Sequence, residues 1–491
     1  MPFFTTTRRL ATAAAGALAL AAGGACKDPT SVPNLNSLPS SVVEGNLNQS
    51  TAQLLVTGLA NRDRDIVSAG SGRYIIFAET LARDVYNIDP SEARFQTELL
   101  GGAIDAAGFI GGSGGFTEAL SAARTADLVI AKINTAADLS TAQQQGVLGI
   151  AYTMKALALY RALEVRGTNG IPVKVAPVGT SGTALQQASP ILCQSSALAV
   201  ISATLDSGAT ALAAGGGAFA VTLPAGYSSN GTFNTPAGFL KFNRGLKGRA
   251  EFYRGLLGGG AANYNAALMA LNASFLDTTA ALTVGVYNTF AASPEVLNPL
   301  AVSTVFLNPT ITTAAAGAGA FGQSQVLQAG DARASKITVA ASTTTRNGVS
   351  TNLRSSLANT SAVNQTRPIA ILRNAELILL RAQTNVELGN LAAATADINV
   401  VRVKDGGLPP IPTVASRDEG RQRVLYEKRF TLLLEGAQRL MDLRSYGFLD
   451  AADLGASQRG SADAFLTGLP IPQSELDQRQ QTAQQAACTN S

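Results

Sequence analysis

The chain has 491 residues with a net charge of +4, and charged residues make up 14% of it, against about 25% in an average globular protein. It contains neither His nor Trp, which excludes Ser-His-Asp triads, Cys-His pairs and His-ligated zinc or haem. An enzyme of this composition would depend on carboxylates, Lys or a cofactor, and the dispersed Lys and Arg residues do not indicate nucleic-acid binding.

Residues 1–25 have the organisation of a secretory signal peptide. Arg8 and Arg9 precede an apolar run at 10–22, whose 13 residues are too few for a membrane span, which needs about 20. Three small residues then lead into Cys26. We expect Cys26 to become the acylated N-terminus of a lipoprotein that is attached to the membrane through its lipid anchor only. An ordinary secretory signal followed by an unrelated Cys is the alternative.

The segment 26–50 is rich in Pro, Ser and Asn and predicts a tether. A helical period then recurs through a predicted domain at 51–491, in scaffold blocks at 51–166, 237–276 and 368–446. The clearest block has apolar residues in steps of three and four, and these residues are Leu372, Ala375, Leu379, Ala382 and Val386. The turn Gly389-Asn390 follows, and a second amphipathic segment begins at Leu391. Two antiparallel helices joined by so short a turn form a tetratricopeptide-like hairpin.

Two further hairpins are predicted, one from 240–257 with 264–275 and one from 116–133 with 147–165. None of these hairpins could bury its apolar face alone, so we expect them to stack. The predicted fold is therefore mainly α, with tetratricopeptide-like hairpins in a right-handed superhelical scaffold and long irregular loop insertions. The insertions at 167–236 and 277–366 are dense in Gly, Ser, Thr, Ala and Asn, and we expect them to face the ligand.

With Cys26 acylated, Cys193 and Cys488 remain. An even number of Cys residues in an oxidising compartment is consistent with a disulfide that ties the C-terminal tail to the middle of the chain. Two unpaired thiols are the other interpretation.

Three stretches of the sequence resemble the SusD/RagB family, the surface lipoproteins that partner TonB-dependent outer-membrane transporters. The first is Tyr-Thr-Met-Lys-Ala-Leu-Ala-Leu-Tyr at 152–160 with Gly-Ile-Pro-Val at 170–173, and the second runs from 371–382 to Asn-Val-Val-Arg at 399–402. The third, the most specific, is Glu-Lys-Arg-Phe-Thr-Leu-Leu-Leu-Glu-Gly at 427–436, then Arg-Leu-Met-Asp-Leu-Arg at 439–444 and Leu-Pro-Ile-Pro at 469–472 with Glu475.

The resemblance implies a SusD-like α-helical domain on the cell surface, anchored by lipid in the outer membrane. It implies a substrate-binding lipoprotein that captures an oligomeric nutrient, either an oligosaccharide or a peptide, and delivers it to a SusC-like TonB-dependent transporter. No catalysis, metal or cofactor is expected. The alternatives are a helical-repeat assembly scaffold and a carboxylate-based glycoside hydrolase.

The third stretch is predicted as part of one helix over 418–446, in which Glu435 and Arg439 form an i,i+4 pair and Gly436 marks a close approach of another helix. Glu427, Glu435 and Asp442 could form a carboxylate site for hydrolysis. We prefer the interpretation that these charges hold helix ends and loops together. Pro470 and Pro472 are expected to lock the C-terminal segment against the helices.

Aromatic faces and planar polar side chains usually bind sugars, so these residue types mark candidate ligand contacts. One group of candidates comprises Arg73, Tyr74, Arg83, Tyr86 and Asn87, and a second comprises Tyr227 and Phe233. Packing of Tyr74 and Phe77 in the core is the alternative for the first group. The absence of Trp argues against a conventional glycan platform, so the ligand class stays open.

Overall fold

The computed structural model describes residues 45–112, 114–176, 179–292, 296–314, 318–322, 325–455 and 463–490. Two compact units divide the chain, Met1–Leu47 and Asn48–Ser491, and the elements below belong to the second unit. The expected signal peptide 1–25, the lipidation site Cys26 and most of the tether 26–50 lie outside the described residues, as does the side chain of Arg73.

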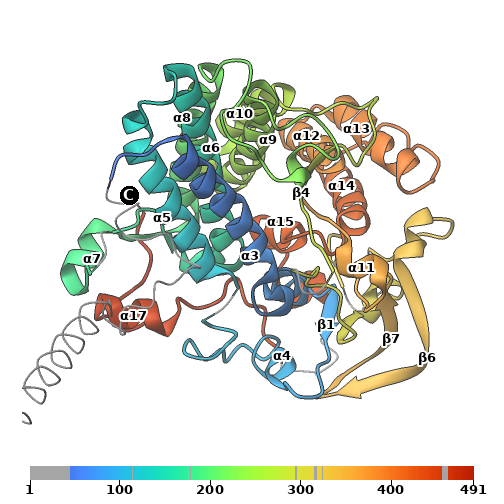
Figure 1. The fold of residues 1–491 in the computed structure, drawn as a ribbon. Coiled ribbons are helices and arrows are strands. Elements are labelled where there is room, and N and C mark those ends of the chain that lie inside the picture. The colour runs from blue at the N-terminus through green and yellow to red at the C-terminus, as the bar shows by residue number, and fades with distance from the viewer. Residues whose placement is uncertain are drawn as a thin grey trace, which may run out of the picture. The chain divides into compact units, whose positions relative to one another are not determined.

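The scaffold consists of helices that pack mainly on their neighbours along the chain (Figure 1). They are α3 (Gln49–Leu81), α5 (Phe116–Lys132), α6 (Thr141–Arg166), α8 (Gln194–Ala213), α9 (Pro236–Arg254), α10 (Gly260–Asn272), α12 (Asn374–Leu388), α13 (Leu391–Lys404), α14 (Arg417–Thr431) and α15 (Gln438–Tyr446). Helix α5 packs on α6, α6 on α8, α8 on α9, α9 on α10, and α12 on both α13 and α14. The mainly α, tetratricopeptide-like architecture predicted from the sequence is confirmed.

Local sequence signals explain several helix ends. Ser140 and Gln143 form a capping box that begins α6, which satisfies main-chain N–H groups that the helix leaves unpaired. Gly389 ends α12 with φ of 79°, a left-handed conformation that Gly adopts without strain. The turn predicted between α12 and α13 is therefore present in the structure.

The insertion 167–236 is less irregular than expected, because it contains the 20-residue helix α8. Its small residues obscured the helical period, and one of them, Gly208, lies close to α6, where an added Cβ would be 3.0 Å from Thr153 Oγ1. A Cβ added at Gly149 of α6 would meet Leu212 Cγ of α8 at 2.4 Å. Among the described residues α8 is also the one helix long and apolar enough to span a membrane. The burial of Leu198, Ile201 and Leu205 between neighbouring helices accounts for that composition.

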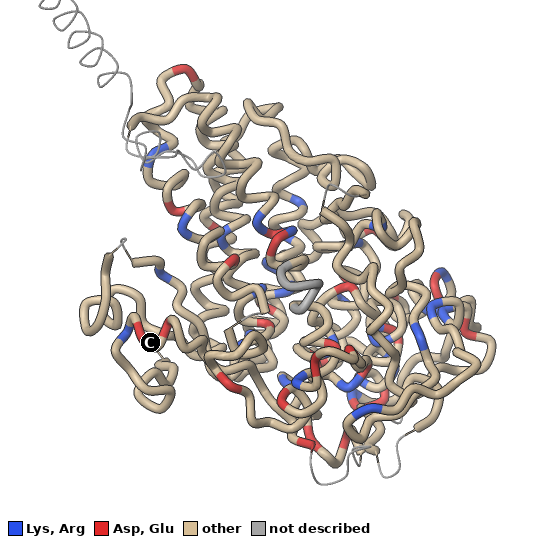
Figure 2. Tube along the Cα trace, turned by 60° about the horizontal axis from the view of Figure 1, so that its bottom comes forward, with Lys and Arg blue, Asp and Glu red and all other residues tan. Residues whose placement is uncertain are grey.

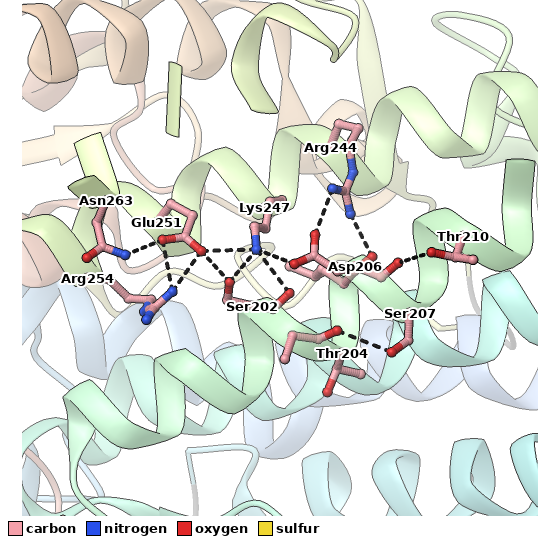
Figure 3. A network of polar contacts seen from close by, with 12 residues as sticks. Ser202, Thr204, Asp206, Ser207, Thr210, Arg244, Lys247, Glu251, Arg254 and Asn263 are labelled. Atoms are coloured by element: carbon pink, nitrogen blue, oxygen red, sulfur yellow. Dashed lines mark hydrogen bonds and ion pairs between the residues drawn. The ribbon is translucent and has the colours of Figure 1, made fainter. Parts of the chain in front are cut away.

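A network of charged and polar side chains joins α8, α9 and α10 (Figure 3). Lys247 Nζ lies 2.6 Å from Asp206 Oδ2 and 3.0 Å from Glu251 Oε1. Arg254 and Asn263 also donate to Glu251. Burial raises the pKa of Glu251, but hydrogen bonds from Ser202, Asn263 and Lys247 outweigh it and lower the pKa below the usual value. The carboxylate therefore stays ionised and holds three helices together.

Four short strands form an antiparallel sheet in the order β1-β5-β7-β6. They are β1 (Val85–Asn87), β5 (Val305–Leu307), β6 (Ile337–Arg346) and β7 (Val349–Ser355), and two small ribbons pair β2 (Ile171–Pro172) with β3 (Ile191–Leu192) and β4 (Gly285–Asn288) with β8 (Ile369–Arg373). Most of the sheet lies within the insertion 277–366, which the sequence predicted as irregular. Strand β5 has three residues, too few to show a period of two, and the buried face of β7 includes the polar residues Thr351 and Ser355, which weakens its apolar alternation.

The remaining helices are short. They are α4 (Arg94–Thr97), α7 (Gly182–Ala188), α11 (Ala362–Thr366), α16 (Ala451–Leu454) and α17 (Gln473–Arg479).

The single helix predicted over 418–446 is wrong, because the chain breaks between α14 and α15. Leu434 has φ of 60°, and its N–H donates to Glu79 Oε1 at 2.9 Å. Glu435 pairs with Arg373 at 2.7 Å instead of with Arg439. Gly436 lies in the break and not inside a helix. Contacts from distant parts of the chain therefore override the local helical pattern.

Charged side chains are scarce in this chain, and many of them form ion pairs buried inside the helical scaffold. Arg249 Nε lies 2.7 Å from Glu376 Oε1, and Lys428 Nζ lies 2.6 Å from Asp442 Oδ2, each with both side chains at most 3% exposed. Figure 2 shows acidic and basic positions interspersed along the trace. Removing one partner of such a pair would leave an uncompensated buried charge.

The C-terminal segment is fastened to the end of α6. Leu469 N–H donates to the Val165 carbonyl at 2.8 Å, and Arg166 Nη1 donates to the Pro470 carbonyl. Cys193 and Cys488 form a disulfide across a sequence separation of 295 residues. The tail is thus held by both main-chain contacts and a covalent bond.

Candidate functional site

A cavity of about 500 Å³ opens where the loop after β1 meets the loop before β5. Its lining residues are Ile76, Asn87, Asp89, Ser91, Glu92, Phe95, Ala301, Val302, Ser303, Thr304 and Thr360. These come from the end of α3, the segment 87–95 and two parts of the insertion 277–366. The cavity therefore joins one of the sequence-predicted ligand regions to one of the predicted ligand-facing insertions.

The β1–β5 pairing holds the two loops side by side. Asn87 pairs with Val305 in the antiparallel register, and Ile88 N–H donates to the Thr304 carbonyl at 2.8 Å. Beyond that bond the two segments leave the sheet at the same end, and residues of both line the cavity. The sequence folds this way because Val85 and Val305 bury their side chains in the sheet.

Two arginines of the β6–β7 hairpin hold these loops in place by hydrogen bonds to their main chain. Arg346 Nη2 donates to the Pro90 carbonyl at 2.5 Å, and Arg354 Nη1 donates to the Ser303 carbonyl at 2.6 Å. The Arg354 guanidinium also lies 3.8 Å from the centroid of the Phe306 ring, a favourable cation–π distance. The hairpin thus positions the cavity walls without lining the cavity.

The main-chain carbonyl of Asn87 is hydrogen-bonded, whereas the oxygen of its side-chain amide is not, within the part of the chain that the structure describes. Its carbonyl accepts a hydrogen bond from Gln96 Nε2, and Gln96 Oε1 accepts one from Asn347 Nδ2 at 3.1 Å. The side chain of Asn87 is 5% exposed, and its Oδ1 has no hydrogen-bond partner among the described residues. A buried acceptor without a donor is costly.

Two carboxylates lie on the cavity wall in different surroundings. Asp89 Oδ1 accepts hydrogen bonds from the Ser91 N–H and hydroxyl at 2.9 and 2.7 Å, which forms an Asx turn. Glu92 accepts two hydrogen bonds from the Arg94 guanidinium, at 2.8 and 2.6 Å, and a third from the Arg94 N–H at 3.1 Å. Among the described residues no Lys or Arg pairs with Asp89 or lines the cavity. The wall is therefore rich in hydrogen-bond acceptors.

The apolar part of the wall is rigid. The ring of Phe95 packs edge-on against Phe77 and Phe109, with centroids 6.0 and 5.5 Å apart, and Phe95 is buried. Ile76 and Val302 complete this side. The cavity can therefore offer a small apolar contact and several hydrogen bonds, but no broad aromatic platform.

Most of the first group of predicted ligand residues lies in the interior and not on a binding surface. Tyr74 has no exposed surface; its hydroxyl donates to Glu164 Oε2 and accepts from Arg161 Nη1. Tyr86 is buried in the sheet core, where its hydroxyl accepts from Asn308 Nδ2 at 2.9 Å. These two predictions are corrected, because a buried ring has no free face for a sugar. The alternative, that Tyr74 and Phe77 pack in the core, is what the structure shows.

Arg83 is also occupied within the protein. Its Nη2 donates to the Ala464 carbonyl at 2.6 Å, and its guanidinium lies over the Phe465 ring. Its φ of 63° turns the chain from α3 into β1. Arg83 therefore holds the C-terminal segment, and Asn87 is the member of the group that lines the cavity.

The second group of predicted ligand residues packs between helices. The Tyr227 ring stacks on Phe239, with centroids 5.8 Å apart, and Phe233 packs edge-on against Phe275 at 4.7 Å. Both Tyr227 and Phe233 are buried at 3% exposure, so their prediction as ligand contacts is corrected. In a chain without Trp, these rings supply the apolar bulk that α9 and α10 need.

Sequence reasoning missed the small polar residues of the cavity because they lack an aromatic signal. Asp89, Ser91 and Ser303 belong to no motif that suggests ligand binding. The triplet Asp89-Pro90-Ser91 does carry a turn signal, since Asp and Ser favour such turns and Pro fixes one backbone angle. That signal could have marked the loop, though not its function.

The three carboxylates considered for hydrolysis do not form a site. Glu427 pairs with Arg333 at 2.7 Å and with Arg402 at 3.1 Å. Burial raises the pKa of Glu427, and Arg333 opposes that rise. Glu435 and Asp442 each pair with a different cation, as described above. The interpretation that these charges hold the scaffold together is therefore preferred, and the described residues contain no group of three or more acidic or Cys side chains that could hold a metal ion.

Comparison with known proteins gives a likeness of fold. No protein-family model matches the chain, and no curated protein matches it. Among solved structures, a SusD homolog from Bacteroides thetaiotaomicron aligns with a TM-score of 0.65 and 12% identity over 91% of this chain and 98% of the other. The B. fragilis protein NanU aligns with a TM-score of 0.61 and 16% identity over 92% and 97%.

A third structure, a SusD-like carbohydrate binding protein from Bacteroides vulgatus, aligns with a TM-score of 0.56 and 15% identity over 82% of this chain and 83% of the other. These identities are low, so the likeness concerns the arrangement of the helices and strands. It extends over most of the length of each chain.

Proposed function

Because the chain has the SusD-like fold, we propose that it is a surface lipoprotein of the outer membrane that captures an oligomeric nutrient and delivers it to a SusC-like TonB-dependent transporter. Binding takes place in the cavity between the segments 88–95 and 301–304. The observation that supports this placement is Asn87, which lines the cavity and whose buried Oδ1 has no protein donor. A ligand hydroxyl would provide the donor once a small movement of the wall exposes this oxygen.

The proposed nutrient is a glycan, and a peptide is the second ligand class. Sugar hydroxyls can both donate and accept hydrogen bonds, and the cavity wall offers an amide, two carboxylates and four hydroxyl side chains. The edge of Phe95 and the side chain of Val302 provide apolar contact for the C–H groups of a sugar ring. One of the structurally similar proteins is described as carbohydrate binding, which supports this choice.

We propose that the protein binds without turnover. The scaffold carboxylates weighed for hydrolysis are engaged in separate ion pairs. Of the two carboxylates in the cavity, Glu92 is held by Arg94. Attachment to the membrane is assigned to acylated Cys26, in line with the signal at 1–25.

Calorimetric titration of oligosaccharide and peptide panels into the purified chain tests the ligand. We expect a family of oligosaccharides to bind and Asn87→Ala to weaken that binding about ten-fold, the order of one hydrogen bond. The described contacts show no hydrogen bond from the Asn87 side chain, so the variant should fold normally. Asn272→Ala, an exposed position at the end of α10, is the matched control. Binding of peptides alone, or equal binding by both variants, would contradict the proposal.

Capture of the chain from native outer membranes tests the partner. Mass spectrometry should identify a TonB-dependent barrel together with the lipidated chain, and Cys26→Ser should remove the chain from the membrane fraction. Recovery of the wild-type chain without any barrel would argue against delivery to a transporter.

A further inference from the structure

We infer that the cavity selects uncharged sugar residues and discriminates against residues that carry a carboxylate, such as uronic acids. This inference rests on the proposed function, because it specifies the ligand of the same cavity. It depends on three observations: the charge on the wall, the engagement of the nearby cations, and the balance of hydrogen-bond donors and acceptors.

The charge on the cavity wall is negative. Asp89 lines the cavity without an ion-pair partner among the described residues, and the N–H and hydroxyl of Ser91 donate hydrogen bonds to it. Glu92 adds a second carboxylate whose charge is balanced by Arg94. An anionic ligand would approach the charge of Asp89 in a partly enclosed space, where repulsion is several times stronger than in bulk water.

The cations around the cavity are already engaged. Arg94 forms a two-bond pair with Glu92, and its guanidinium lies 4.4 Å from the centroid of the Phe109 ring. Arg346 and Arg354 donate to the carbonyls of Pro90 and Ser303, in the two loops that line the cavity. Among the side chains that the structure describes, a carboxylate in the cavity would therefore find no guanidinium free to bind it, although bidentate Arg contacts are the usual means of carboxylate recognition.

The wall accepts hydrogen bonds more readily than it donates them. Asn87 Oδ1 and the two carboxylates are acceptors, while the Ser91 hydroxyl already donates to Asp89. A sugar hydroxyl can donate to these groups, whereas an ionised carboxylate can only accept. An anion in the cavity could accept hydrogen bonds only from the hydroxyls of Ser303, Thr304 and Thr360 and the amide of Asn87, in the same cavity as the charge of Asp89.

The test compares neutral and anionic oligomers on the full chain. The neutral probes are malto-, cello-, xylo- and manno-oligosaccharides, and the anionic probes are oligogalacturonate and oligomannuronate, all titrated calorimetrically at low salt. We expect at least one neutral series to bind and both uronate series to bind at least ten-fold more weakly. The difference should shrink as the salt concentration rises, since salt screens partly exposed charges.

Asp89→Asn separates this inference from a structural effect. The substituted amide keeps an oxygen that can accept from Ser91 but removes the charge, so uronate affinity should rise, and the ratio of uronate to neutral affinity should increase about ten-fold. Asp477→Asn, an exposed Asp on α17, is the matched control and should change neither affinity.

The possible failures are distinguishable. Uronate binding equal to or tighter than neutral binding, or an unchanged uronate affinity in Asp89→Asn, would overturn the charge selection and leave the proposed binding function standing. A complete absence of oligosaccharide binding would overturn the proposed function, and with it this inference.

Discussion

Arg429 and Asp84 form a buried ion pair, with Nη2 2.7 Å from Oδ1 and both side chains at most 1% exposed. Arg429 belongs to α14, within the sequence stretch that most resembles the SusD/RagB family, and Asp84 immediately precedes β1. The Asp84 carbonyl also accepts from the Asn308 N–H, just beyond β5. The pair therefore fixes the position of the two strands that hold the candidate cavity.

Replacement of Arg429 by Ala should destabilise the chain severely. The variant leaves Asp84 charged, buried and without its main partner, which costs about 3–5 kcal/mol in comparable pairs. Urea unfolding followed by circular dichroism measures this change. Arg423→Ala is the control, because its pair with Glu419 is exposed and such pairs contribute about 0–1 kcal/mol. Similar losses in the two variants would contradict the role given to the buried pair.

Loss of the disulfide should lower stability while leaving the fold intact. The bond between Cys193 and Cys488 restricts the unfolded chain over 295 residues, and removal of a native disulfide costs roughly 2–5 kcal/mol. Thermal unfolding of the double Ser variant, compared with the wild type with and without reductant, measures the effect. The reductant should lower the Tm of the wild type alone. A variant as stable as the oxidised wild type would show that the other contacts of the tail suffice.

Lys336 should produce a characteristic rise of stability with pH. Its Nζ donates to the Phe430 and Thr431 carbonyls at the end of α14, both at 2.7 Å, and burial lowers its pKa from 10.5 to about 8. Between these values the unfolded chain binds more protons at this site than the folded chain, so stability increases as pH rises. The free energy of unfolding of the wild type relative to Lys336→Met should therefore increase from pH 7.5 to 9.5.

Unfolding in urea at several pH values tests the Lys336 prediction. The comparison with Lys336→Met removes the contributions of other groups, including buried tyrosines, because both proteins share them. A difference that stays constant or falls over this pH range would show that the Lys336 pKa is not lowered.

Arg354→Gln should weaken ligand binding with little loss of stability. The variant removes the guanidinium that donates to the Ser303 carbonyl and lies on Phe306, so the cavity wall at 301–304 loses a support. We expect an affinity loss of about three- to ten-fold, equivalent to roughly 1 kcal/mol. Calorimetry measures the affinity, and hydrogen exchange should increase in 301–304. Arg354→Lys, which keeps a donor, should restore part of the affinity. Unchanged exchange in the loop would contradict the positioning role.

The helical hairpins could be predicted because local signals determine them. Apolar residues in steps of three and four along α12, together with Gly389 at its end, identify that helix from the local sequence alone. Helix α8 escaped prediction because its many Ala, Ser, Thr and Gly residues weaken the apolar period, and one of them, Gly208, lies against α6. The break after α14 could not be predicted, since it depends on Glu79, which is 355 residues from Leu434.

The sequence indicated the part of the chain in which the candidate site lies, but it did not identify most of the residues that line it. Asn87 and the insertion 277–366 were both predicted to face the ligand, and both contribute to the cavity. The emphasis on aromatic side chains was misleading, because Tyr74, Tyr86 and Tyr227 are needed inside a protein that has no Trp. Which polar loop residues meet in space depends on the pairing of β1 with β5, and single-sequence patterns do not contain that information.

The disulfide makes the chain from Cys193 to Cys488 a closed covalent ring. The largely exposed strand β6 and the cavity loop 301–304 both belong to the part of the sequence between these two cysteines. A protease that cuts once within the ring therefore severs the backbone without releasing a fragment. A nicked molecule would run as one species on a non-reducing gel and as two after reduction, and both halves of the cavity would remain attached to the same scaffold.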